Sequence, residues 1–89
     1  MTSFICNVEA FWDSEALVWV ATSEDVPGLV TEAETIEALT QKLRVMIPEL
    51  VVLNKIVPSD YVGSITFELT SHRQELIEVT SIQEFILYS

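Results

Sequence analysis

Hydrophobic and polar residues alternate near the start of the chain. Over residues 4–12, every second position is apolar: Phe4, Cys6, Val8, Ala10 and Trp12. A period of two predicts a strand with one buried face. Residues 16–23 are rich in β-forming residues on both faces, which predicts a second, more central strand. The short polar segment 13–15 between them is typical of a hairpin loop.

A sharp turn is expected after the second strand. Residues 25–28 read DVPG, in which Pro27 has a fixed φ and Gly28 tolerates a positive φ. A type II turn needs a positive φ at its third residue and favours proline at its second, so we predict one here. Residues 29–33 then predict a short third strand.

One long helix is predicted by apolar residues spaced alternately three and four apart. They are Ile36, Leu39, Leu43, Met46, Leu50 and Leu53. This spacing places one stripe on one helical face, which we expect to pack on the sheet. Thr35 is the expected N-cap, and Asn54 is expected to end the helix in a left-handed conformation. Pro48 lies inside the pattern and predicts a kink or an early last turn.

The remaining residues predict a further strand and a short extension. Gly63 opens a strand over 64–71, in which Ile65, Phe67 and Leu69 share one face. Residues 72–74 are expected to turn, 75–79 to form a short strand, and 81–84 to form a capping box or an extended tail. The predicted fold is α+β: a three- to four-stranded antiparallel sheet with one amphipathic helix on one face, in the order β-β-β-α-β. Residues 1–89 form a single domain, with a core over 3–71 and a C-terminal extension over 72–89.

Charge narrows the classes of partner. The chain of 89 residues has 14 acidic and 4 basic side chains, for a formal net charge of −10. Nucleic-acid backbones are polyanions that are bound through Lys and Arg, so we expect no direct nucleic-acid binding. A basic protein is the natural complement, because opposite potentials speed encounter and disfavour wrong partners. The alternative is that the acidity only keeps a small protein soluble.

No pattern of catalytic or metal-binding residues stands out. Cys6 is the one cysteine and is expected to be a small buried hydrophobic residue, while the one histidine, His72, is expected in an exposed turn. We therefore expect no enzymatic activity, no cofactor and no metal. The N-terminus lacks a signal peptide, and no apolar run approaches the roughly 20 residues that cross a bilayer, so we expect a cytoplasmic protein without membrane association. Trp12 and Trp19 pack in the core or, alternatively, anchor an interface.

The run of motifs over residues 12–54 resembles the HicB antitoxin family, and within it the uncharacterised bacterial relatives of those antitoxins. The resemblance is carried by VWVATS at 18–23, DVPGLVTEA at 25–33 and the helix-opening Thr35. It implies a fold partly like a double-stranded-RNA-binding domain, with Pro27, Gly28 and Thr35 as its structural turn and cap. It also implies a homo-oligomer, most simply a homodimer.

The function implied by the resemblance is contact with HicA, a small basic ribonuclease of toxin–antitoxin modules. We expect that partner to meet acidic groups near the DVPG turn: Glu24, Asp25, Glu32 and Glu34. The chain departs from many family members because only ten residues follow Val79, too few for a DNA-binding domain. The alternative is therefore a stand-alone homo-oligomeric domain with a structural or regulatory role and no toxin partner.

Overall fold

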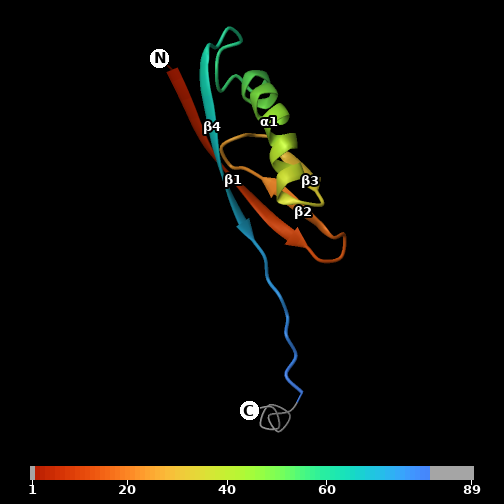
Figure 1. The fold of residues 1–89 in the computed structure, drawn as a ribbon. Helices are drawn as coiled ribbons and strands as arrows, with labels where there is room; N and C mark the ends of the chain where they lie inside the picture. Colours follow the sequence, from red (N-terminus) through yellow and green to blue (C-terminus); the bar gives the residue numbers. More distant parts are fainter. Residues whose placement is uncertain (1, 81–89) are drawn as a thin grey trace.

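The chain forms four strands and one helix over residues 2–80, the part that the computed structural model describes (Figure 1). In chain order they are β1 (Thr2–Asp13), β2 (Val18–Thr22), β3 (Val30–Ala33), α1 (Ile36–Leu53) and β4 (Gly63–His72). The predicted α+β class, with one sheet and a single helix, is confirmed. The capping box expected at 81–84 lies outside the described residues.

The four strands form one mixed sheet in the order β3-β2-β1-β4. β2 is antiparallel to both β1 and β3, but β4 runs parallel to β1, from Thr2 beside Gly63 to Phe11 beside His72. The expectation of a wholly antiparallel sheet is therefore wrong for β4. The cause is α1, whose 18 residues span about 27 Å and return the chain from β3 to the end of the sheet where β1 starts. β4 then begins beside the start of β1 and follows the same direction (Figure 1).

The core lies between α1 and one face of the sheet. The predicted alternation of β1 is confirmed, because Cys6, Val8 and Ala10 are completely buried on the side of α1. Ala21 on β2 and Ala33 on β3 continue this buried side, and their small side chains leave room for the helix. The buried hydrophobic residues are Cys6, Val8, Ala10, Ala21, Val26, Leu29, Ala33, Leu39, Leu43, Ile47, Val51 and Val57.

The buried stripe of α1 differs from the predicted one in its second half. Leu39 and Leu43 are buried as expected, and Met46 and Leu50 are half-buried against the core. The fully buried line, however, continues through Ile47 and Val51, and Leu53 is 75% exposed. Residues four apart are turned by about 40° relative to each other, so a stripe of fours winds slowly around the helix. The twisted sheet beneath α1 accepts this winding line, whereas the alternating spacing of three and four would keep a straight one.

The two ends of α1 are capped by local chemistry. At the start, the Thr35 side chain accepts a hydrogen bond from the Ala38 N–H at 3.0 Å, as predicted for the N-cap. At the end, Asn54 has φ −88° and is not left-handed; Lys55 takes that conformation, with φ 57°. Asn54 is held differently, because its Nδ2 donates to the carbonyls of both Leu50 and Pro27. These bonds tie the DVPG turn to the end of the helix.

Pro48 does not shorten α1, which continues for five further residues to Leu53. The ring of Pro48 lies on the exposed side of the helix. An early last turn is therefore absent, because the carbonyl left without its N–H partner can be reached by solvent there.

After β4 the chain runs away from the body of the molecule (Figure 1). We call residues 73–80 the arm. The turn expected at 72–74 is wrong at its first residue, because His72 still pairs with Phe11 in the sheet. The strand expected over 75–79 is absent, because the arm has no neighbouring strand to pair with inside the described part of this chain.

Candidate functional site

The face of the sheet opposite α1 is left uncovered, and we call it the open face. Alternate residues of all four strands lie on it, and three large apolar side chains there are well exposed: Ile5 (68%), Phe11 (47%) and Val30 (66%). The full set is Ser3, Ile5, Asn7, Glu9, Phe11, Asp13, Val18, Val20, Thr22, Val30, Glu32, Ser64, Thr66, Glu68, Thr70 and His72.

The open face is acidic. Glu9, Glu32 and Glu68 lie on it, and within residues 2–80 it carries no lysine or arginine. The basic residues lie elsewhere: Lys42 and Arg44 are on α1, Lys55 follows it, and Arg73 lies at the end of β4 on the α1 side. Exposed apolar groups interspersed with charges of one sign are typical of a protein-binding surface.

The four acidic residues expected to contact a partner are not gathered in one place. Glu24 lines a polar hollow together with Glu9, a residue that is distant in sequence and was not predicted. Glu32 lies on β3 on the open face, while Glu34 is exposed between β3 and α1. The hollow is lined by Asn7, Glu9, Thr22, Ser23, Glu24, Asp25 and Thr70 and has a volume of about 310 Å³.

Asp25 connects the loop after β2 to β1. Its Oδ2 accepts a hydrogen bond from the Asn7 N–H at 2.7 Å, and the Ser23 hydroxyl donates to the Asn7 carbonyl. β2 pairs with β1 only from Glu9 to Asp13, so these two side chains replace a strand partner where β2 has ended. Burial, together with the nearby Asp25 carboxylate, raises the pKa of the Cys6 thiol above its ordinary value.

The DVPG turn has the predicted geometry. Gly28 has φ 82°, and the Leu29 N–H donates to the Val26 carbonyl at 3.1 Å. A positive φ at the third residue of a turn closed by this hydrogen bond defines type II. Together with the bond from Asn54 to Pro27, the turn fixes the path of the loop that carries Glu24.

The C-terminal end of β4 makes aromatic contacts on both faces of the sheet. On the open face the His72 ring stacks on Phe11 at 4.7 Å between centroids. On the α1 side the Arg73 guanidinium lies 4.3 Å from the centroid of the Trp12 ring, which meets Trp19 edge-on at 5.4 Å. The two tryptophans are thus partly buried and packed against each other, as expected for residues directly opposite in the sheet.

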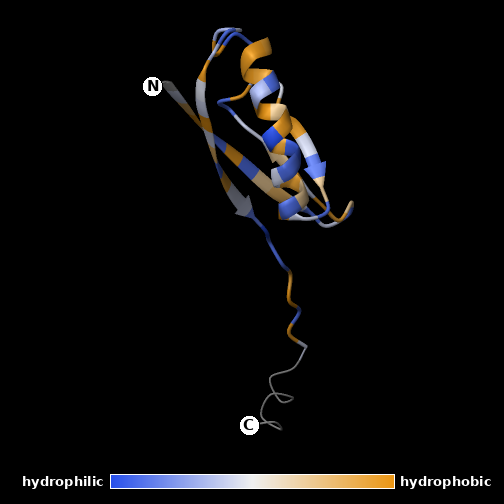
Figure 2. Cartoon of the chain, turned by 45° about the horizontal axis from the view of Figure 1, so that its top comes forward, coloured by the Kyte–Doolittle hydropathy of each residue, from blue (hydrophilic) through white to orange (hydrophobic). Residues whose placement is uncertain are grey.

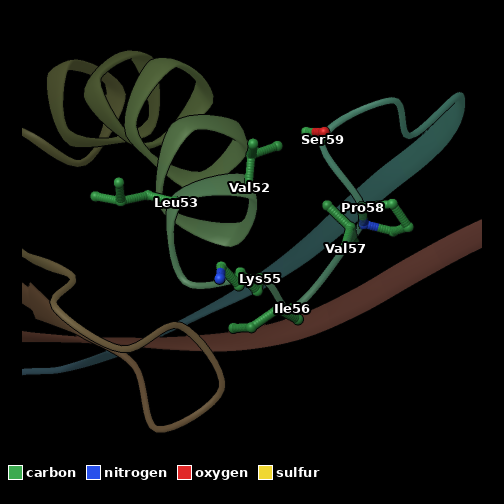
Figure 3. A pocket seen from close by; sticks show the side chains of 7 residues that line it. All are labelled: Val52, Leu53, Lys55, Ile56, Val57, Pro58 and Ser59. Carbon is green, nitrogen blue, oxygen red and sulfur yellow. The ribbon is translucent and has the colours of Figure 1, made fainter.

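A second hollow lies at the end of α1 and is largely apolar (Figure 3). Val52 points toward Ser59 across it, while Leu53 projects away from the following loop (Figure 3). It is lined by Val52, Leu53, Lys55, Ile56, Val57, Pro58 and Ser59. Apart from the Lys55 amine and the Ser59 hydroxyl, the side chains that line the hollow are apolar. The hollow therefore suits an apolar side chain.

Residues 2–80 contain no cluster of three His, Cys, Asp or Glu side chains arranged to hold a metal ion. None of the helices described has both the length and the hydropathy needed to span a bilayer.

These features define a small α+β domain with one helix and an uncovered acidic and apolar sheet face. The model of a family described as a domain of unknown function (DUF1902) matches residues 5–81, so the chain belongs to this family. A solved structure, the hypothetical protein TTHA1013 from the extremely thermophilic bacterium Thermus thermophilus, is 42% identical, with a TM-score of 0.64. The similarity covers 82% of this chain and 99% of that one. No curated protein matches.

Proposed function

We propose that this protein is a non-catalytic binding module that neutralises a small basic HicA-like ribonuclease by direct contact. The observation that carries the proposal is the open face, on which Glu9, Glu32 and Glu68 lie among exposed apolar side chains. No lysine or arginine of residues 2–80 lies on this face.

Charge and apolar area have separate roles in this proposal. The net charge of −10 attracts a cationic protein and raises the rate of encounter. Ile5, Phe11 and Val30 then supply the apolar contact from which most binding energy comes. The hollow offers a Lys or Arg side chain of the partner the Glu24 carboxylate and the Glu9 carboxylate, whose Oε1 also lies 3.1 Å from His72 Nε2.

Binding at this face would inhibit a ribonuclease by competition. A protein that cleaves RNA must present cationic side chains to the phosphate backbone. An acidic face that engages the same side chains excludes the RNA without any chemistry of its own. We place this encounter in the cytoplasm.

The test is titration of a purified HicA-like ribonuclease with this protein, followed by calorimetry and by RNA cleavage. We expect saturable binding that weakens as salt is raised, because exposed charges are screened. RNA cleavage should fall in proportion to the complex formed. Undiminished cleavage at low salt with the protein in excess would overturn the proposal.

A further inference from the structure

We infer that two copies of this chain pair through their β4 strands, antiparallel about a twofold axis, with each arm running along the start of β4 in the other copy. The pairing extends the sheet edge to edge and leaves the open face uncovered. The test of this pairing is therefore independent of the proposed ribonuclease partner.

The two edges of the sheet differ in how they are protected. β3 has only four residues, and its Glu32 carbonyl already accepts a hydrogen bond from Lys42 Nζ. β4 has ten residues, contains no lysine or proline, and pairs with β1 one residue to one without a bulge. Natural edge strands are usually protected by lysines, prolines or bulges, because an unprotected edge pairs with another chain. The edge of β4 has none of these three features. With one open edge per copy, pairing closes at two copies and does not propagate.

The arm supplies the second part of the argument. Leu76, Ile77 and Val79 are 87%, 81% and 67% exposed, so three large apolar side chains stand in solvent on an extended segment. Figure 2 shows the hydrophobic positions alternating with hydrophilic ones along this segment, after the arrow of β4. Eight extended residues reach about 26 Å, enough to follow most of a ten-residue strand. A second copy offers the arm both backbone partners and apolar contact.

Charge favours one register of the pair and disfavours two of its neighbours. With Thr70 on the twofold axis, Glu68 of each copy lies opposite His72 of the other, which is favourable, and Thr70 meets Thr70. Moving the axis to Leu69 would place Glu78 opposite Asp60, and moving it to Glu68 would place that carboxylate opposite itself. Like charges directly opposite each other are destabilising.

The same register brings the arm onto the start of β4 in the second copy. Leu76 then lies opposite Ser64, and Ile77 lies opposite Gly63, which has no side chain to obstruct it. The apolar arm also approaches Val62, which is 84% exposed in the single chain. Exposed apolar groups of both copies are thus buried together.

Disulfide trapping tests the register. Opposite residues of antiparallel strands have Cα atoms about 4.5–5.5 Å apart, within the range that a disulfide spans. Thr70→Cys should therefore cross-link to itself under mild oxidation. Thr66→Cys is the matched control, because it lies on the same strand and face but about 27 Å from its copy in this register. Cys6 is completely buried and does not compete.

Sedimentation equilibrium tests the assembly. We expect twice the chain mass of 10.0 kDa for the unmodified protein and a dimer at least tenfold weaker for the double variant Leu76→Asp, Ile77→Asp. Val45→Asp, at a 61% exposed position on α1, is the control and should remain dimeric. A monomeric unmodified protein at high micromolar concentration, cross-linking of Thr66→Cys as readily as Thr70→Cys, or an unweakened double variant would each overturn the inference.

Discussion

The Asp25 carboxylate accepts a hydrogen bond from the Asn7 N–H, with 2.7 Å between Oδ2 and N. The bond joins the β2–β3 loop to the part of β1 that β2 does not reach. It thereby sets Glu24 beside Glu9, two glutamates that are 15 positions apart in the sequence (24 − 9). Asp25, which is expected to contact a partner, thus also shapes the surface on which partner contacts are proposed.

Replacement of Asp25 tests this structural role. Asp25→Ala should lower the free energy of unfolding by about 1 kcal/mol, because the Asn7 N–H loses its charged acceptor and exchanges it for water. Urea denaturation measures the change. Glu24→Ala, one residue away and exposed, should stay within about 0.5 kcal/mol of the parent. Equal losses in the two variants would show that the hydrogen bond contributes nothing specific.

The Cys6 thiol predicts a dependence of stability on pH. Burial first, and the Asp25 carboxylate second, raise its pKa in the folded state. The folded protein then holds the thiol proton more tightly than the unfolded chain does. The stability from this group is complete below the ordinary thiol pKa and is lost as the pH rises through the raised value. The free energy of unfolding should therefore fall as the pH rises above the ordinary thiol pKa of about 8.5.

Cys6→Ala provides the reference for this measurement, since other groups that titrate in the same range are common to both proteins. The parent should lose stability with pH more steeply than the variant. Parallel profiles would contradict the raised thiol pKa. Asp25→Asn should lie between the two, because it removes the smaller of the two causes.

Gly28 should resist substitution for reasons of backbone conformation alone. Its φ of 82° lies in the left-handed region, and an added Cβ would meet Leu50 Cδ2 at 3.8 Å, an ordinary contact. Gly28→Ala should therefore destabilise the fold by about 1–2 kcal/mol through backbone strain. Gly63→Ala, in the extended conformation of β4, is the control and should cost less by thermal denaturation. An unchanged melting temperature for Gly28→Ala would argue against the type II turn.

The winding of the buried stripe on α1 can be checked with two leucines. Leu43 is completely buried and Leu53 is 75% exposed, although the apolar spacing places both on one stripe. Leu43→Ala should cost about 2–5 kcal/mol of folding free energy by chemical denaturation, because it leaves a cavity. Leu53→Ala should change it by less than about 0.5 kcal/mol. Similar costs for both would favour the straight stripe.

Features set by neighbouring residues were predictable from the sequence. The alternation of β1, the turn at Gly28 and the cap at Thr35 each depend on chemistry within a few positions, and each occurs where expected. The left-handed residue after α1 was predicted at Asn54, but Lys55, one position later, adopts that conformation. The Asn54 side chain is engaged by Pro27, a contact 27 residues away that local reasoning does not contain.

The open face required information about pairing that the sequence alone does not provide. Glu68 lies beside Asn7 because β4 is parallel to β1, and an antiparallel β4 would pair other residues. Glu9 was missed for the same reason: it precedes the recognisable DVPG region, and only the sheet brings it to Glu24. The acidic residues that were predicted were those close to the turn in sequence. Of the four predicted residues, Glu32 lies on the open face and Glu24 lines its hollow. Asp25 also lines the hollow, but its carboxylate is bonded to the Asn7 N–H.

The most direct test of the central claim is the affinity of a HicA-like ribonuclease for charge variants of the open face. Glu9→Gln, Glu32→Gln and Glu68→Gln combined should weaken binding by at least tenfold and flatten its salt dependence, because they remove the carboxylates proposed to meet the cationic partner. Three glutamines at Glu37, Glu49 and Glu75 change the net charge equally but lie off this face, and should leave most of the affinity intact. Equal weakening by both sets would show that the affinity depends on net charge and not on the open face. No binding by the unmodified protein would contradict the account.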